Sequence, residues 1–248
     1  MVSYKTNQQC KHFKEVKYSQ IASNSIFLYE KKIPNYNSSL ISSLTYYWPF
    51  NNGVTDIVSG VTLSGGSATG KSFSYDRMNK DLSALYLNNA YYNLPTGTYL
   101  YGDCSVTVWV KLRVLTLWSN VFVIGTSSGI GSAYAIWLGF SYSTTAKPFI
   151  RACNTYTIST ISLDTDKWYH VAYTYKGTTT TIYVNGELAV QNPSDCAAIN
   201  VVRNYNNIGA YNNAGIIDHQ PNADIDDLKL FNKTLSQSEI LNDMNSYY

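Results

Sequence analysis

The sequence predicts an all-β protein, an antiparallel two-sheet β-sandwich with one short helix near its C-terminus. Runs of β-branched and aromatic residues recur along the chain, separated by turns rich in Gly, Asn and Ser. Only 14% of the 248 residues are charged, whereas 23 are tyrosine, and this composition favours strands over soluble helices. A chain of this length buries roughly 70% of its unfolded surface, so its core does not depend on disulfides.

Residues 168–190 predict a three-strand antiparallel meander. The β-prone runs 168–176 and 179–184 flank a turn at Gly177. Asn185-Gly186 then predicts a type I′ turn, because both residues tolerate positive φ. The run from Glu187 to Val190 returns as the third strand.

Shorter runs predict the other strands of the sandwich. They cover residues 44–50, 84–87, 91–94, 104–112, 122–125, 134–140, 148–153, 207–210 and 224–231. The segment between residues 54 and 71 is rich in Gly and Ser and predicts a surface loop. The C-terminal helix is expected around residues 235–241, where Ser236 and Glu239 have the spacing of a capping box.

The first 43 residues differ in composition from the rest and predict a separate extension, leaving residues 44–248 as the domain. Residues 1–34 carry a net charge of +4 and the remainder −2, so the domain has no basic field that would attract nucleic acid. The sequence contains neither an apolar run of ~20 residues nor an apolar signal core, and membrane insertion is not expected.

The four cysteines contain no C-x-x-C pair, which argues against zinc. Cys104 alternates with Val106 and Val108, and we expect it to be a small buried residue. Cys153 and Cys196 are the preferred disulfide pair in an oxidising compartment, while Cys10 lies in the extension.

Several short motifs, in order, resemble the laminin G-like, concanavalin A-like jelly-roll family over residues 44–245. The matching segments are Tyr47-Trp-Pro-Phe-Asn, Ser105-Val-Thr-Val-Trp-Val, Trp168-Tyr-His-Val-Ala, Tyr183-Val-Asn-Gly and Ile225-Asp-Asp-Leu-Lys-Leu-Phe-Asn with Leu235-Ser and Glu239-Ile. The resemblance implies a jelly-roll sandwich that binds carbohydrate or protein ligands on a secreted or cell-surface protein. It also implies a calcium ion near the meeting point of the first and last strands.

Strand alternation predicts the orientation of Asp226 independently of the family resemblance. In a regular strand Asp224, Asp226, Leu228 and Leu230 share one face, and the leucines belong in the core. An inward carboxylate needs backbone N–H groups, a cation or a metal, and calcium prefers oxygen ligands. Asp56, in Asp-Ile-Val-Ser-Gly, resembles the family loop that completes the calcium site, although that loop carries an extra residue here. Two alternatives remain open: a structural calcium at Asp56 and Asp226, or hydrogen bonding of Asp226 alone to backbone amides, which would hold two strands together.

The remaining candidate side chains have simpler roles. His170 alternates with Trp168 and Ala172 and has no neighbouring nucleophile in sequence, so we expect a packing role. Trp109 is expected to pack rather than to form a sugar-stacking platform. The loop from residue 204 to 220 is rich in asparagine, whose amides pair with hydroxyls, and in tyrosine, whose rings stack on sugars. The candidate ligand-binding residues on it are Tyr205, Asn206, Tyr211, Asn212 and Asn213.

The first hypothesis for function is therefore a non-catalytic module that binds glycan. The second is an adhesion or receptor ectodomain module that binds an extracellular protein. A glycoside hydrolase of the same fold is the third and least favoured, because that chemistry needs two paired carboxylates. The chain has four glutamates, and none lies in such a neighbourhood.

Overall fold

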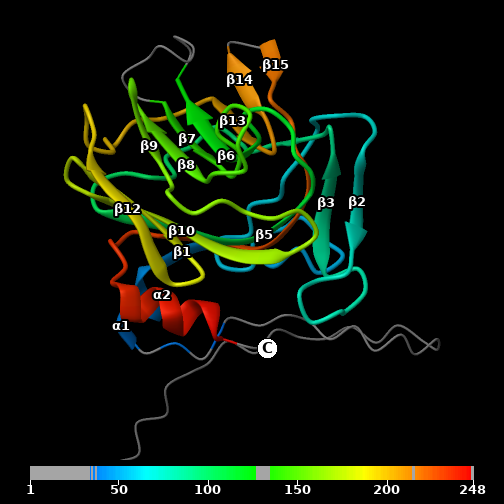
Figure 1. Ribbon diagram of the computed structural model, residues 1–248, viewed down its shortest axis with the longest axis horizontal. Helices are drawn as coiled ribbons and strands as arrows, with labels where there is room; N and C mark the ends of the chain where they lie inside the picture. Colours follow the sequence, from blue (N-terminus) through cyan, green and yellow to red (C-terminus); the bar gives the residue numbers. More distant parts are fainter. Residues whose placement is uncertain (1–33, 35, 37, 127–134, 214–215, 247–248) are drawn as a thin grey trace, which may run out of the picture. The chain divides into compact units, whose positions relative to one another are not determined.

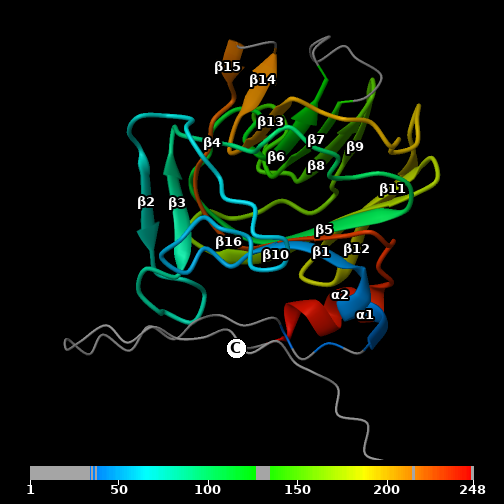
Figure 2. The ribbon, with the colours of Figure 1, turned by 180° about the vertical axis from the view of Figure 1, so that it is seen from behind.

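The computed structural model describes residues 34, 36, 38–126, 135–213 and 216–246 (Figure 1). One compact unit, from Lys31 to Tyr248, contains all of them. Two antiparallel sheets stack as layers, and Figure 2 shows the same arrangement from behind. The predicted β-sandwich is therefore confirmed. Neither helix in the described part of the chain is long and apolar enough to cross a bilayer.

The larger sheet has eight strands in the order β12-β11-β10-β5-β16-β3-β2, and β1 also pairs with β16. Its strands are β1 (Leu44–Trp48), β2 (Lys71–Ser74), β3 (Ala84–Asn88), β5 (Cys104–Val114), β10 (Trp168–Lys176), β11 (Thr179–Val184), β12 (Glu187–Pro193) and β16 (Asn222–Phe231). The first and last described strands of the domain are thus neighbours, and β16 pairs with β1, β3 and β5.

The smaller sheet has six strands in the order β4-β13-β6-β7-β8-β9. Its strands are β4 (Tyr92–Asn93), β6 (Asn120–Gly125), β7 (Ile136–Gly139), β8 (Phe149–Ala152), β9 (Thr155–Ile158) and β13 (Tyr205–Ile208). A separate hairpin of β14 (Tyr211–Asn213) and β15 (Ile216–Asp218) follows β13. The sequence pattern does not predict β2, β9, β14 or β15.

The main core lies between the two sheets and is built by alternation. On β5, Val106, Val108 and Val110 point inward, and Cys104 shares their face as predicted. Phe122 and Ile124 of β6 belong to the same buried cluster.

The predicted meander is formed by β10, β11 and β12. Asn185 and Gly186 have φ of 50° and 77°, as a type I′ turn requires. A Cβ at Gly186 would lie 2.3 Å from the Leu241 side chain, so glycine there also allows the C-terminal helix to pack.

That helix is α2 (Gln237–Met244), and Ser236 with Glu239 forms the predicted capping box. A second helix, α1 (Ser38–Ser43), precedes β1 and lies within the segment predicted to be the extension. Leu40 of α1 is buried with Leu235 and Ile240 in a second apolar cluster outside the larger sheet. The expected domain boundary at residue 44 therefore falls inside the compact unit. Figures 1 and 2 show both helices side by side against the eight-stranded sheet.

The expected alternation along β16 is wrong at one point. Leu228 and Leu230 are in the core as predicted, but so is Ile225. A bulge separates them: Asp226 pairs with Trp109, Lys229 pairs with Thr107, and Asp227 between them has φ of 48°. Because the bulge adds one residue, Asp224 and Asp226 point to the outer face of the sheet rather than to the core.

Candidate ligand-binding face

The outer face of the six-stranded sheet carries a row of side chains that crosses all its strands. Cross-strand pairing places Asn93 beside Asn207, then Val123, Trp137, Arg151 and Tyr156 in turn. The residues on either side of Trp137, namely Ile136 and Leu138, face the core. Period-two alternation thus gives this sheet one apolar inner face and one aromatic outer face.

Trp137 lies at the centre of this row and is covered by two neighbours. The Arg151 guanidinium lies 4.2 Å from the centre of its ring, and Tyr211 approaches edge-on with ring centres 4.5 Å apart. Arg151 also lies 5.6 Å from the centre of the Tyr156 ring. Trp137 is therefore buried, while Arg151 and Tyr156 remain partly exposed.

Trp118, in the β5–β6 connection, joins the row to a hollow beside it. Its ring contacts Tyr142 and Tyr156, with centres 4.6 and 5.7 Å apart, and stacks at 23° on His219. The residue has φ of 55°, which turns the chain sharply before β6. The hollow is lined by Asn89, Thr116, Leu117, Trp118, Asp218, His219 and Gln220. Aromatic surface and polar groups therefore converge at this end of the face, as they do in ligand sites.

The Tyr211 hydroxyl has no hydrogen-bond partner among the described residues, although it is buried. Burial raises the pKa of Tyr211 to about 12, so the hydroxyl stays protonated and can donate. A buried hydroxyl without a partner is costly in a folded protein.

The five predicted ligand residues have different surroundings in the structure. Tyr211 belongs to the aromatic cluster, and Tyr205 on β13 is half-buried. The Asn206 amide donates to the Pro95 and Arg203 carbonyls at 3.0 and 2.8 Å, so it braces the backbone instead of facing a ligand. Asn212 is half-buried, and the side chain of Asn213 lies outside the described residues.

Most of this face is not predicted by the sequence pattern. The residues outside the predicted ligand set are Trp118, Trp137, Tyr142, Arg151 and Tyr156. The available signal is alternation along β7 and β8, which places Trp137 and Arg151 opposite the core residues. The pairing of these strands is what brings them together.

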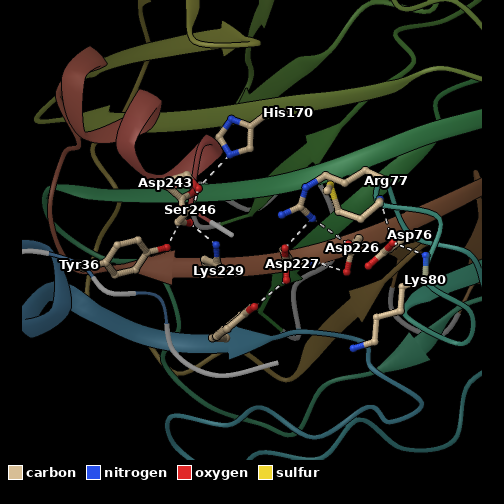
Figure 3. Close-up of polar contacts among 12 residues, drawn as sticks. Tyr36, Asp76, Arg77, Lys80, His170, Asp226, Asp227, Lys229, Asp243 and Ser246 are labelled. Atoms are coloured by element: carbon tan, nitrogen blue, oxygen red, sulfur yellow. Dashed lines mark hydrogen bonds and ion pairs between the residues drawn. The ribbon is translucent and has the colours of Figure 1, made fainter. Parts of the chain in front are cut away.

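The outer face of the eight-stranded sheet is instead filled with paired charges (Figure 3). Arg77, in the β2–β3 connection, contacts Asp226 and Asp227 at 3.0 and 2.7 Å. Its guanidinium also lies 4.6 Å from the centre of the Trp109 ring. Trp109 therefore packs under a cation, as expected for a structural role. Asp224 pairs with Lys111 and Arg113.

A second group of charges lies between α2 and the eight-stranded sheet, around Asp243 of α2. Its carboxylate contacts Lys229 at 2.8 Å and His170 Nε2 at 3.2 Å, and Tyr36 donates a hydrogen bond to it. Figure 3 shows these side chains converging from separate elements. Burial lowers the pKa of His170, while Asp243 opposes that shift. Buried and held in this way, His170 has a packing role, as expected.

The carboxylates proposed for calcium do not fit that ion well. Asp56 accepts hydrogen bonds from the backbone of Tyr47, Val58 and Ser59 and from the Ser59 hydroxyl. Asp226 is neutralised by Arg77, so its cation partner is a guanidinium. No group of three His, Cys, Asp or Glu side chains in the described ranges is placed to hold a metal. The calcium site stays a prediction, and Asp226 accepts a backbone hydrogen bond, from Asp227 N–H at 2.9 Å, beside its ion pair with Arg77.

Cys153 and Cys196 form a disulfide with their Cα atoms 6.2 Å apart. It links the β8–β9 turn to the segment after β12. Cys104 is a free, buried thiol.

Two stacked antiparallel sheets of eight and six strands, with the first and last described strands paired, define a concanavalin A-like β-sandwich. The family model described as the concanavalin A-like lectin/glucanases superfamily matches residues 87–241, and the chain belongs to this family. A search of curated protein sequences gives no significant match.

Solved structures share the fold at low sequence identity. Domain 4 of AbnA, an extracellular arabinanase from Geobacillus stearothermophilus solved in complex with arabinotriose, superposes with a TM-score of 0.63 and 19% identity, covering 82% of this chain and 98% of that domain. The binding domain of Paraclostridial Mosquitocidal Protein 1 gives 0.60 and 13%, and that of botulinum neurotoxin serotype D/C gives 0.60 and 16%. Each of these two superpositions covers 83% of this chain but only 52% of the toxin domain.

Proposed function

We propose that this domain is a non-catalytic carbohydrate-binding module and that the aromatic outer face of the six-stranded sheet is its binding surface. One observation carries the proposal: Trp118, Tyr142 and Tyr156 form a partly exposed aromatic group next to a hollow with polar walls. Rings stack on the apolar faces of sugars, while amides, carboxylates and imidazoles bond their hydroxyls.

Two further features support this proposal. The Arg151 guanidinium lies among the aromatic rings, where it can donate hydrogen bonds to the hydroxyl groups of a bound oligosaccharide. A domain of the same fold was solved with arabinotriose, so that trisaccharide is the first probe to try.

The disulfide suits an oxidising compartment, and we propose that the domain lies outside the cell or on its surface.

The test is calorimetric titration with arabinotriose and with gluco-, xylo- and galacto-oligosaccharides. We expect one of them to bind, and Trp118→Ala to weaken that binding about tenfold, which corresponds to ~1.4 kcal/mol. Trp168→Ala is the matched control, because Trp168 is a half-buried tryptophan on the eight-stranded sheet. Thermal melting of each variant separates loss of binding from loss of fold.

Failure of all these sugars to bind, or equal affinities for wild type and Trp118→Ala, would remove the proposal. Release of reducing ends from the bound oligosaccharide would reveal a glycoside hydrolase instead. We expect none, because Asp224, Asp226 and Asp227 are each paired with a cation on the opposite sheet.

A protein-binding adhesion module is the second candidate. Leu117, which lines the hollow, is 56% exposed, and an exposed apolar side chain beside aromatic rings also suits a protein partner. Binding to an extracellular protein that Trp118→Ala abolishes, without any sugar binding, would favour this alternative.

A further inference from the structure

A second hollow lies between β1 and the connection from β4 to β5, at the edge of the larger sheet. It is lined by Thr45, Tyr46, Ser59, Thr98, Tyr99, Tyr101, Cys104 and Asn232. None of these residues is acidic or basic, and three are tyrosines. Its volume of about 210 Å³ is below the ~300–1,000 Å³ typical of pockets for drug-sized ligands. The space therefore suits one small ring or one chain end.

The aromatic wall of this hollow is held in place by the fold. Tyr46 stacks on the buried Trp48 with ring centres 5.5 Å apart and planes at 3°. Tyr99 leans on Tyr46 with centres 5.3 Å apart, and its hydroxyl donates to the Pro95 carbonyl at 2.7 Å. Since these rings are fixed before any ligand arrives, binding does not have to order them.

The connection that carries Tyr101 is also anchored. Gly97 pairs with Arg203 through two backbone hydrogen bonds of 3.0 and 2.9 Å. The Arg203 guanidinium donates to the Leu100 carbonyl at 3.1 Å, and Gly102 N–H donates to the Ala198 carbonyl at 2.6 Å. Tyr101 itself is 43% exposed, so its ring is accessible at the mouth of a rigid hollow.

Polar groups of this hollow remain available. Within the described residues, the hydroxyls of Tyr46 and Tyr101 and the side-chain amide of Asn232 make no hydrogen bond with another protein group. Burial raises the pKa of Tyr46, with Asp56 and Tyr101 adding to the effect, so that its hydroxyl keeps its proton. Uncharged donors and acceptors next to aromatic walls match a ligand that is rich in hydroxyls and carries no charge.

We propose that this hollow is a second carbohydrate site, which takes a single neutral sugar ring or chain end. It is distinct from the aromatic face, because the two share no lining residue. Without a cation in its walls, the site discriminates against sugar acids.

The test is saturation-transfer NMR with L-arabinose, D-galactose and D-glucose as neutral probes and D-glucuronate as the charged one. We expect at least one neutral sugar to receive saturation and D-glucuronate to receive much less. Tyr101→Ala should weaken the neutral sugar about 3- to 10-fold, the loss expected for one aromatic contact. The protein is produced in bacteria, so that Asn232, in an Asn-Lys-Thr triplet, carries no glycan.

Two control variants distinguish binding in this hollow from binding elsewhere on the domain. Tyr75→Ala removes a tyrosine of similar exposure (52%, against 43% for Tyr101) from the β2–β3 connection and should leave the signal unchanged. The wild-type and Tyr101→Ala measurements are repeated in the Trp118→Ala background, so that any sugar bound at the aromatic face does not contribute to the signal assigned to this hollow. Three outcomes would each overturn the proposal. They are no saturation of any of the three neutral sugars, full signal in both Tyr101→Ala and Asn232→Ala, and saturation of D-glucuronate equal to that of the neutral sugars. Because oligosaccharide binding at Trp118 is measured separately, either site can fail alone.

Discussion

The outer faces of the two sheets carry different kinds of side chains. At the outer face of the eight-stranded sheet, the carboxylates of Asp226 on β16 and Asp243 on α2 are buried and paired with Arg77 and Lys229. On the six-stranded sheet, aromatic rings surround the guanidinium of Arg151, and several of these rings stay partly exposed.

The contrast separates a surface that stabilises the domain from one that can bind a partner. Buried charges that are already satisfied have nothing left to offer a ligand, and removing one partner is costly. Partly exposed rings and donors contribute less to the stability of the fold and remain accessible to a ligand. Substitutions on the first face should therefore change stability, and those on the second should change binding.

The largest effect is expected at Asp243. Asp243→Asn removes the negative charge that Lys229 and His170 both contact, and should lower the free energy of unfolding by about 3–5 kcal/mol. Urea denaturation measures the change. Asp218→Asn, at a carboxylate that is 66% exposed, is the control and should change stability little. A small effect at Asp243 would mean that the covered face does not stabilise the domain.

The same group predicts a loss of stability in acid. Burial alone would raise the pKa of Asp243, but Lys229 and His170 hold it well below its ordinary value of 3.8. Burial also lowers the pKa of His170 below 6.5. Both groups bind protons more readily in the unfolded chain, so stability falls as the pH drops below about 6.5 and falls further below about 3.8. Unfolding free energies measured across this range should show a shallower acid dependence in Asp243→Asn below about pH 3.8, where only the wild type carries the carboxylate.

A smaller loss of stability is expected on substitution of Arg77, which pairs with Asp226, one of the two residues predicted to bind calcium. Arg77→Met leaves Asp226 and Asp227 without the guanidinium and should cost about 2–3 kcal/mol. In the wild-type protein, calcium or a chelator should leave the melting temperature unchanged. A clear stabilisation of wild type by calcium would restore the ion predicted at Asp56 and Asp226.

The smallest effect on stability is expected on the aromatic face. Arg151→Met removes a partly exposed cation and its ring contacts, at a cost to folding of about 0.5–1 kcal/mol. It should nonetheless weaken oligosaccharide binding, because the donors of Arg151 lie among the rings. A variant that binds normally but unfolds readily would reverse the assignment of the two faces.

Much of the fold is predictable from sequence, because β-prone runs and turn residues act locally. The meander at residues 168–190 and the capping box at Ser236 are of this kind. The binding face is not predictable in the same way. Trp137, Arg151 and Tyr156 become neighbours only through the register of three strands, and Trp118 reaches them from a connection. Of the predicted ligand residues, Tyr211 joins this cluster, whereas the Asn206 amide braces the backbone.

The bulge at Asp227 has a consequence for how this chain can change. It lets β16 work as two half-strands whose inside and outside are exchanged: Ile225 and Leu228 both face the core although they are three residues apart. Deleting Asp227 alone would restore an unbroken repeat of two that keeps Ile225, Leu228 and Leu230 inward and Asp224 and Asp226 outward. The deletion would remove the contacts that Asp227 makes with Arg77 and Tyr47. A deletion at this position should therefore be better tolerated than a deletion elsewhere in β16, which would reverse the faces of the residues beyond it. Alignments of related chains that allow no gap here would misplace the aspartates relative to the leucines.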